Sequence, residues 1–203
     1  MNAPRQLFIR RLPTRRLLTR QAFISAGANL GDRAGTLRGA LAALARTPGI
    51  ARVESSPLYE TAPVDVPDQP AFLNLAAGVE TTLSPERLLA CLLAIEADFG
   101  RVRDPARPRG PRTLDLDLLL YEGEHRAAAA GNGDSNAAGT ASLTLPHPRM
   151  WRRAFVLVPL RELVKTHVGW MRSADWAAAR RRLSRALRTS EIKNQDVSIH
   201  EKR

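Results

Sequence analysis

The residues best suited to chemistry lie in one stretch, RGPRTLDLDLLLYEG, at residues 109–123. Asp115 and Asp117 alternate there with leucines, although aspartate is among the residues least favoured in strands. Side chains alternate along a strand, so both carboxylates face one way, roughly 6.5–7 Å apart. Two ionised carboxylates repel unless a cation lies between them, and Mg²⁺ commonly takes one or two carboxylates plus substrate phosphates. Alternatively, the pair is only the polar outer face of a half-buried sheet.

Arginines crowd the loop that precedes this strand. They are Arg101, Arg103, Arg107, Arg109 and Arg112. A guanidinium binds phosphate oxygens through two parallel hydrogen bonds. Paired carboxylates beside such a loop supply the positioning and charge neutralisation that phosphoryl transfer requires. The combination therefore favours phosphoryl transfer over a loop of solvated arginines.

Four further residues are candidates for ligand contacts. His147 stands in PHPRMWRR, among arginines, and is suited to donating a hydrogen bond to phosphate. Asn74 lies in an apolar strand, where its amide offers donors and an acceptor to the edge of a heterocycle. Phe72 and Phe155 are two of only five phenylalanines. A surface turn for the histidine, and core packing for the others, are the alternative interpretations.

The elements that position these residues follow from hydrophobic spacing and capping signals. Asp32 and Ser84 are suited to capping two helices, and Gly100 to ending the second. The expected strands cover residues 22–27, 50–61, 71–82 and 113–121. This order predicts an α+β, ferredoxin-like βαββαβ core, in which an antiparallel sheet has its helices packed on one face.

Charge and composition limit the class of protein. The 203 residues carry a net charge of +11, of which residues 1–20 supply +6 and residues 166–203 supply +5. Residues 21–165 carry equal numbers of basic and acidic residues, so the core lacks the excess of positive charge expected of a groove that binds nucleic acid. The sequence contains no run of about 18 apolar residues, so no membrane-spanning helix is predicted. The single cysteine, Cys91, allows no intrachain disulfide, which fits a reducing cytosol.

Five blocks of the sequence resemble one known family. They are AGANLGD (26–32), SPLYETAPV…DQPAFLN (56–74), IEADFGRVR (95–103), GPRTLDLDLLLY (110–121) and LPHPRMWRRAFVLVPL (145–160). In this order they are similar to the signature blocks of the 6-hydroxymethyl-7,8-dihydropterin pyrophosphokinases of folate biosynthesis. The resemblance covers residues 22–163.

The resemblance implies an activity and its partners. Such an enzyme transfers pyrophosphate from ATP to 6-hydroxymethyl-7,8-dihydropterin and releases AMP. ATP and the pterin would be its small-molecule substrates, with two Mg²⁺ ions as cofactors. The family is monomeric and cytoplasmic, and it requires neither nucleic acid nor a membrane.

The resemblance also implies roles for single residues. Asp115 and Asp117 match the positions that bind the two Mg²⁺ ions, and Arg101 and Arg112 match those that hold the phosphates and support catalysis. The matches to the ATP site are Glu96, Arg103, Arg112, Leu118, Thr144, His147 and Arg153. The matches to the pterin pocket, where two aromatic rings sandwich the pterin, are Thr61, Val64, Phe72, Asn74 and Phe155.

The chain departs from the family at several places. Ala28 replaces the usual serine of the first block, and Pro108-Arg109 stand where some members carry a tryptophan. We expect residues 1–21 to be a disordered basic extension and residues 22–163 to form the pyrophosphokinase domain, with a flexible insertion at 125–142. Residues 164–203 lack the usual ending and are expected to form a basic, partly helical segment.

Two other functions use similar features. A minimal nucleotidyltransferase also has an Asp-x-Asp metal pair, but it usually places a Gly-Ser turn upstream, and none precedes Asp115. An RNA-binding module on a ferredoxin-like sheet would display stacking aromatics on its central strands. The strand at 113–121 instead carries two aspartates and Tyr121.

Overall fold

The computed structural model describes residues 18–63, 68–103, 110–126, 143–167, 169–189 and 197–199. Its elements are β1 (Arg20–Ala28), α1 (Arg33–Arg46), β2 (Ile50–Ser55), β3 (Tyr59–Thr61), β4 (Phe72–Thr81), α2 (Pro85–Asp98), β5 (Asp115–Tyr121), the short 3₁₀ helix η1 (Met150–Arg152), α3 (Ala154–Thr166), the 3₁₀ helix η2 (Ala174–Trp176), α4 (Ala177–Ala186) and β6 (Val197–Ile199).

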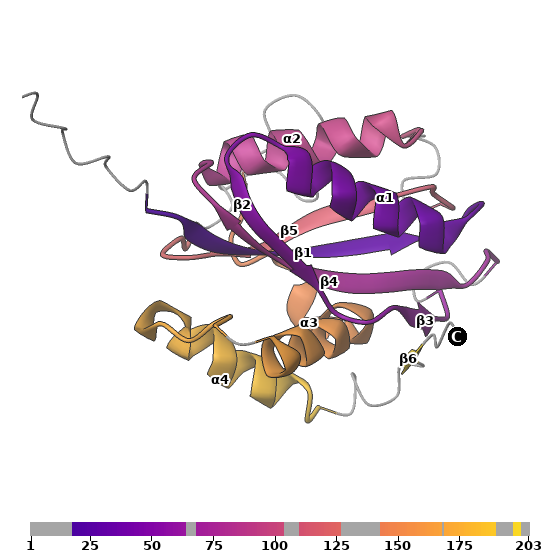
Figure 1. Cartoon of the computed structure of the whole chain (residues 1–203). Helices are drawn as coiled ribbons and strands as arrows, with labels where there is room; N and C mark the ends of the chain where they lie inside the picture. The colour runs from indigo at the N-terminus through magenta and orange to yellow at the C-terminus, as the bar shows by residue number, and fades with distance from the viewer. Residues whose placement is uncertain are drawn as a thin grey trace, which may run out of the picture.

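The strands form one antiparallel sheet in the order β5-β1-β4-β3-β6, and β2 also pairs with β4. The helices α1 and α2 cover one face of this sheet (Figure 1). The predicted ferredoxin-like βαββαβ core is therefore confirmed. β6 lies on the outer side of β3, where it covers an edge that would otherwise expose unpaired backbone groups.

The prediction of one strand over residues 50–61 is wrong, because the segment divides into β2 and β3. Pro57 has no N–H to donate to a ladder, and the break falls beside it. Ser56, beside the break, keeps this segment hydrogen-bonded to β4. Its backbone N–H donates to the Ala76 carbonyl at 2.9 Å, and its hydroxyl accepts from the Ala76 N–H at 3.1 Å.

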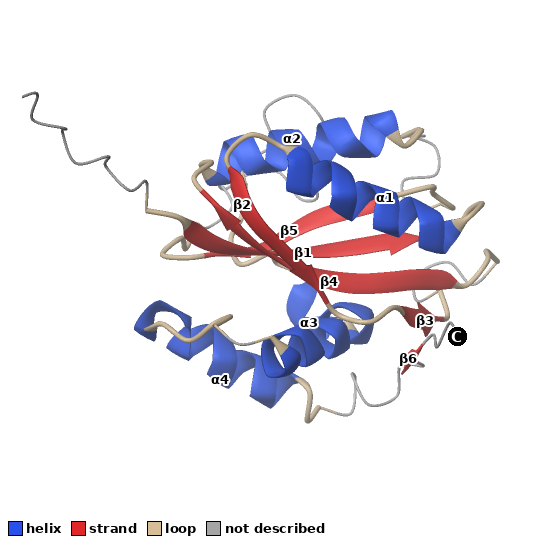
Figure 2. Ribbon diagram, in the orientation of Figure 1, coloured by secondary structure: helices blue, strands red, loops and turns tan. Residues whose placement is uncertain are grey.

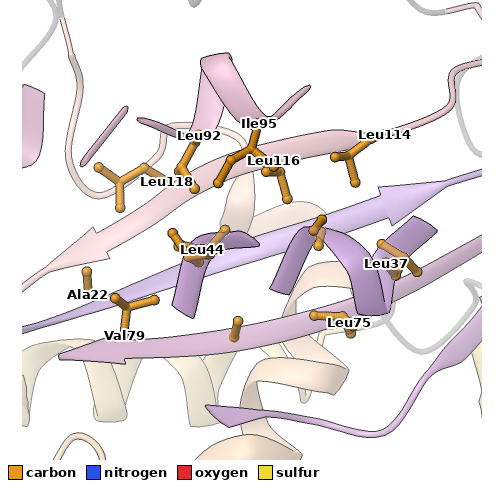
Figure 3. Packing of buried hydrophobic residues seen from close by; sticks show 14 of the residues in the cluster. Ala22, Leu37, Leu44, Leu75, Val79, Leu92, Ile95, Leu114, Leu116 and Leu118 are labelled. Carbon is orange, nitrogen blue, oxygen red and sulfur yellow. The ribbon is translucent and has the colours of Figure 1, made fainter. Parts of the chain in front are cut away.

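The face under α1 and α2 holds the larger apolar cluster. Leu37 and Leu44 of α1 and Leu92 of α2 pack there against the sheet (Figure 3). Leu114, just before β5, and Leu116 and Leu118 of β5 belong to the same cluster, which fixes the orientation of that strand. The residues that alternate with these leucines must therefore face the other way.

Two additional helices, α3 and α4, cover the opposite face of the sheet (Figure 2). Leu157 and Leu160 of α3 and Leu183 of α4 share a buried apolar cluster there with Phe23 of β1. The expected domain boundary at residue 163 falls inside α3, and β1 begins at Arg20, within the expected extension. The described part of the 164–203 segment thus shares a core with the sheet.

The remaining expectations concern the ends and the insertion. Residues 1–17 of the extension and 127–142 of the insertion lie outside the described residues. The two sides of the insertion meet, because the Arg126 N–H donates to the Leu145 carbonyl at 2.8 Å and the Leu145 N–H returns a bond at 3.0 Å. Among the described residues, no helix is long and apolar enough to cross a membrane.

Trp170 anchors the segment after α3 to the sheet. Its indole is 2% exposed, and its N–H donates to the Glu54 carboxylate at 2.7 Å. The same carboxylate lies 3.0 Å from Nδ1 of His167. Gly78 of β4 makes room for the ring, because a Cβ there would lie 2.9 Å from the indole. The close approach of this ring to the β4 backbone depends on that glycine.

We expect Gly78→Ala to lower the free energy of unfolding by about 1–3 kcal/mol, because the added methyl overpacks against Trp170. Urea unfolding measures the loss. A double-mutant cycle with Trp170→Ala is the control, since the cost of Gly78→Ala should shrink once the indole is gone. An equal cost in both backgrounds would contradict this explanation.

Candidate active site

The two aspartates lie on β5 on the face turned away from α1 and α2. Asp115 pairs with Gly27 of β1, and Asp117 pairs with Ser25. Both neighbours are small, so the carboxylates are not covered by side chains of the adjacent strand. They remain 25% and 24% exposed, which leaves their oxygens accessible to a ligand.

Arginines from three separate segments converge on this pair. Arg101, after α2, lies 3.2 Å from one oxygen of Asp115, and Arg112, before β5, lies 3.0 Å from the other. Arg153, between η1 and α3, reaches to 3.9 Å from Asp117. The structure therefore brings together both predicted metal ligands and both predicted catalytic arginines.

The electrostatics of the pair favour a bound cation. Burial, together with the negative charge of Asp115, raises the pKa of Asp117 above its ordinary value, although Arg153, Arg112 and Arg149 oppose the shift. A divalent cation would favour both ionised carboxylates. Within the described ranges, no group of three or more His, Cys, Asp or Glu side chains could hold a metal. Two carboxylates fit Mg²⁺, which completes its coordination with water and phosphate, better than an ion caged by protein alone.

Arg101 and Glu96 attach the loop after α2 to β5. Arg101 donates to the Leu114 carbonyl at 2.8 Å, and burial lowers the pKa of its guanidinium. Glu96, in α2, is 2% exposed and accepts the Leu116 N–H at 2.7 Å. Its carboxylate also pairs with Arg103. Because β5 is an edge strand, Glu96 satisfies a backbone donor that the sheet leaves unpaired.

The predicted pterin residues of the sheet lie close together. Asn74 donates through its amide to the Thr61 hydroxyl at 2.8 Å, and both side chains are buried. Asn74 lies opposite Gly27, where a Cβ would come within 2.6 Å of the amide oxygen. The glycine that leaves Asp115 uncovered therefore also accommodates the amide of Asn74.

Each of the two predicted aromatic residues contacts an arginine that also faces one of the two carboxylates. The Arg112 guanidinium lies over the Phe72 ring at 5.0 Å while it pairs with Asp115. Arg153 lies over the Phe155 ring at 5.5 Å and faces Asp117. A planar ligand held by these rings would consequently lie next to the predicted metal ligands.

Four predicted residues have less direct positions. Leu118 is 2% exposed in the apolar core, so its side chain is not accessible to a nucleotide. Thr144 is half-buried near the base of the insertion. His147 is buried, and its backbone N–H donates to the Leu119 carbonyl at 2.8 Å. Val64 lies outside the described residues.

Sequence reasoning missed Asn29, which connects the chain around Arg112 with the chain just before Phe72. Its side-chain oxygen accepts the Arg112 N–H at 2.7 Å, and its own N–H donates to the Arg112 carbonyl at 3.1 Å. Its amide also donates to Gln69 and to the Pro70 carbonyl, both at 3.1 Å. The available signal was an asparagine in the first signature block, which on its own resembles an ordinary turn residue.

Comparisons with known proteins assign the chain to one family. Residues 23–165 match the family described as 7,8-dihydro-6-hydroxymethylpterin-pyrophosphokinase (HPPK). Two relatives named 2-amino-4-hydroxy-6-hydroxymethyldihydropteridine pyrophosphokinase cover 70% of the chain. The protein of Methylorubrum extorquens is 43% identical over 82% of its length, and that of Bacillus subtilis is 41% identical over 77%.

Longer proteins match over part of their length. A mitochondrial folate synthesis bifunctional protein of Pisum sativum is 41% identical over 77% of this chain and 27% of its own. The crystal structure of wild-type Plasmodium falciparum HPPK-DHPS matches 72% of this chain at a TM-score of 0.51 and 13% identity. This chain spans 41% of that structure, and at such low identity the likeness shows the fold alone. The chain therefore belongs to the 7,8-dihydro-6-hydroxymethylpterin-pyrophosphokinase family, as the blocks of its sequence indicate.

Proposed function

We propose that the protein transfers the terminal pyrophosphoryl group of ATP to the hydroxymethyl oxygen of 6-hydroxymethyl-7,8-dihydropterin. The pterin oxygen forms a bond to the β-phosphorus and loses its proton. The bond between the β-phosphorus and the oxygen that bridges it to the α-phosphate breaks, and AMP leaves with that oxygen. One observation beyond family membership supports this activity: Arg112 and Arg153 each face a carboxylate and an aromatic ring at once. Such an arrangement supports a phosphate site directly beside a site for a planar heterocycle.

The metal site belongs to the phosphate half of this arrangement. We assign Asp115 and Asp117 as ligands of two Mg²⁺ ions, which when bound neutralise charge on the triphosphate. Arg101 and Arg112 hold the transferred group in place. Each guanidinium has five N–H donors and uses only part of them on Asp115, so donors remain for phosphate oxygens. Positioning and neutralisation of charge are the main requirements of phosphoryl transfer.

The remaining residues complete the two substrate sites. Glu96, Arg103, Thr144, His147, Arg153 and the backbone of Leu118 are assigned to ATP, and Thr61, Val64, Phe72, Asn74 and Phe155 to the pterin. Asn74 keeps hydrogen-bonding capacity beyond its bond to Thr61, which suits the amide edge of a pterin. Stacking on Phe72 and Phe155 would hold the ring so that its hydroxymethyl group faces the phosphates.

We also propose that the enzyme acts as a cytoplasmic monomer, without nucleic acid or a membrane. The balanced charge of residues 21–165 and the single cysteine support this assignment. Size-exclusion chromatography with light scattering would test the oligomeric state.

The activity is tested directly by incubating the protein with ATP, Mg²⁺ and the hydroxymethyl pterin. We expect AMP and the pterin diphosphate to form in equal amounts, as measured by chromatography. Formation of ADP, or of free pyrophosphate without a pterin product, would contradict pyrophosphoryl transfer.

We expect Asp117→Ala to fold normally and to lower turnover by about 10²–10⁴, because it removes a metal ligand that stabilises the transition state. Steady-state assays at saturating Mg²⁺ measure the loss. Asp98→Ala is the matched control, since it removes an exposed carboxylate at the end of α2. Equal activities of the two variants would overturn the metal assignment.

We expect Phe155→Ala to weaken pterin binding about tenfold, since it removes stacking and apolar contact, while ATP affinity stays within about twofold. Calorimetry with each ligand separates the two effects. Val158→Ala truncates a residue of the same helix that packs on the same cluster. If it weakens pterin binding as much, damage to the core explains the result.

Glu96 should give the stability a distinct dependence on pH. Burial raises the pKa of its carboxyl from 4.5 to about 7. A raised carboxyl pKa contributes stability that is full below the unfolded value of 4.5 and is lost as the pH rises towards 7. We expect Glu96→Gln to remove this loss, which amounts to about 3 kcal/mol.

Urea unfolding at pH 5 and pH 8 measures this difference between the variant and the unaltered protein. The stability of Glu96→Gln relative to the parent should rise from pH 5 to pH 8. A relative stability that does not change with pH would show that Glu96 is not the group responsible.

A further inference from the structure

A separate cavity of about 110 Å³ lies between α4 and the turn that follows β5. Its lining residues come from the end of β5 and its turn, from Pro146 and Trp151, and from η2 and α4. All of them lie outside the set assigned above to ATP, metal and pterin. This space is smaller than the engineered apolar cavity of about 150 Å³ that binds benzene, so it admits at most a single small ring.

Trp176 lines the cavity and carries an unused hydrogen-bond donor. The side chain is 3% exposed, and within the described residues its indole N–H has no acceptor. The ring is held from behind by an edge contact with Phe23 at a centroid distance of 5.1 Å. The indole of Trp170, by contrast, donates to Glu54. Since a buried indole N–H usually has a partner, an occupant with an acceptor would satisfy Trp176.

Arg182 gives the cavity a positive charge. Its guanidinium lies over the Trp151 ring at 4.5 Å, and both residues line the space. In the described ranges, no carboxylate forms an ion pair with Arg182. Of the two acids in the lining, Glu124 is paired with Arg126 at 2.8 Å, and Asp175 is exposed. Arg182 is therefore the cation that lies against an aromatic ring of the lining.

We propose that this cavity is a second ligand site, which binds a small aromatic carboxylate. The ring packs against the indoles of Trp151 and Trp176, and the carboxylate accepts the Trp176 N–H and pairs with Arg182. Trp151 lies between Arg149 and Arg153 in the chain, so an occupant would also restrain the segment that carries these arginines towards Asp117. The binding itself does not depend on the activity proposed above.

Benzoate is a suitable probe, titrated into the full chain by calorimetry and tryptophan fluorescence. We expect saturable binding with a dissociation constant of about 1 mM or lower. Trp176→Phe keeps a ring but removes the donor, and Arg182→Gln removes the charge, so each should weaken binding at least about fivefold. Arg181→Gln is the matched control, because this exposed neighbour does not line the cavity and should leave affinity unchanged.

Several results would overturn the proposal. They are the absence of saturable binding, equal affinity in all three variants, and displacement of benzoate by ATP, which would place the probe among the active-site arginines. Arg182→Gln alters an exposed side chain, so it keeps the test valid even if Trp176→Phe fails to fold. Pyrophosphokinase turnover without benzoate should be unchanged in both cavity variants, which separates this site from the catalytic one.

Discussion

The site depends on the ion pairs that the Asp115 carboxylate forms with Arg101 and Arg112. Two carboxylates on one face of a strand repel each other, and burial adds to the cost of ionising them. Guanidiniums within hydrogen-bond distance offset that cost and favour the charged form. The two arginines come from opposite ends of the segment 101–112, so the ion pairs also fix where that segment begins and ends at the edge of the sheet.

The fold brings these charges together through contacts that are not themselves charged. Leu114 and Leu116 are buried under the helices, and this forces the intervening Asp115 to the opposite face. Asn29 then binds the backbone of Arg112 and the chain just before Phe72, which places a cation over the aromatic ring. The proposed pterin and phosphate halves of the pyrophosphokinase site are thereby connected through one buried amide.

Local signals in the sequence were sufficient for much of the fold. Asp32 and Ser84 cap α1 and α2 as predicted, since their side chains accept from Gly35 and Arg87 at 2.9 and 3.3 Å. The face of β5 that carries the aspartates followed from alternation alone. The family resemblance supplied the set of candidate site residues, whose roles remain predictions.

The features that were missed depend on tertiary contacts. α3 contains Pro159, which disfavours a helix locally, yet Leu157, Leu160 and Leu163 are spaced to bury one face against the sheet. The role of Asn29 is visible only when residues far apart in the chain are placed side by side. To predict the break between β2 and β3 beside Pro57, one would have to know that both strands pair with the same continuous strand, β4.

The paired backbones of Arg126 and Leu145 have a consequence for how the sequence of this protein can vary. They join the two sides of the expected insertion with two hydrogen bonds, so the rest of the molecule meets the same two anchor points whatever the number of residues between them. The entropy of closing a flexible loop grows only with the logarithm of its length, by about 0.6 kcal/mol per doubling. Evolutionary drift in length, and the grafting of a foreign peptide or a label, should therefore be tolerated at this position with little effect on the sheet.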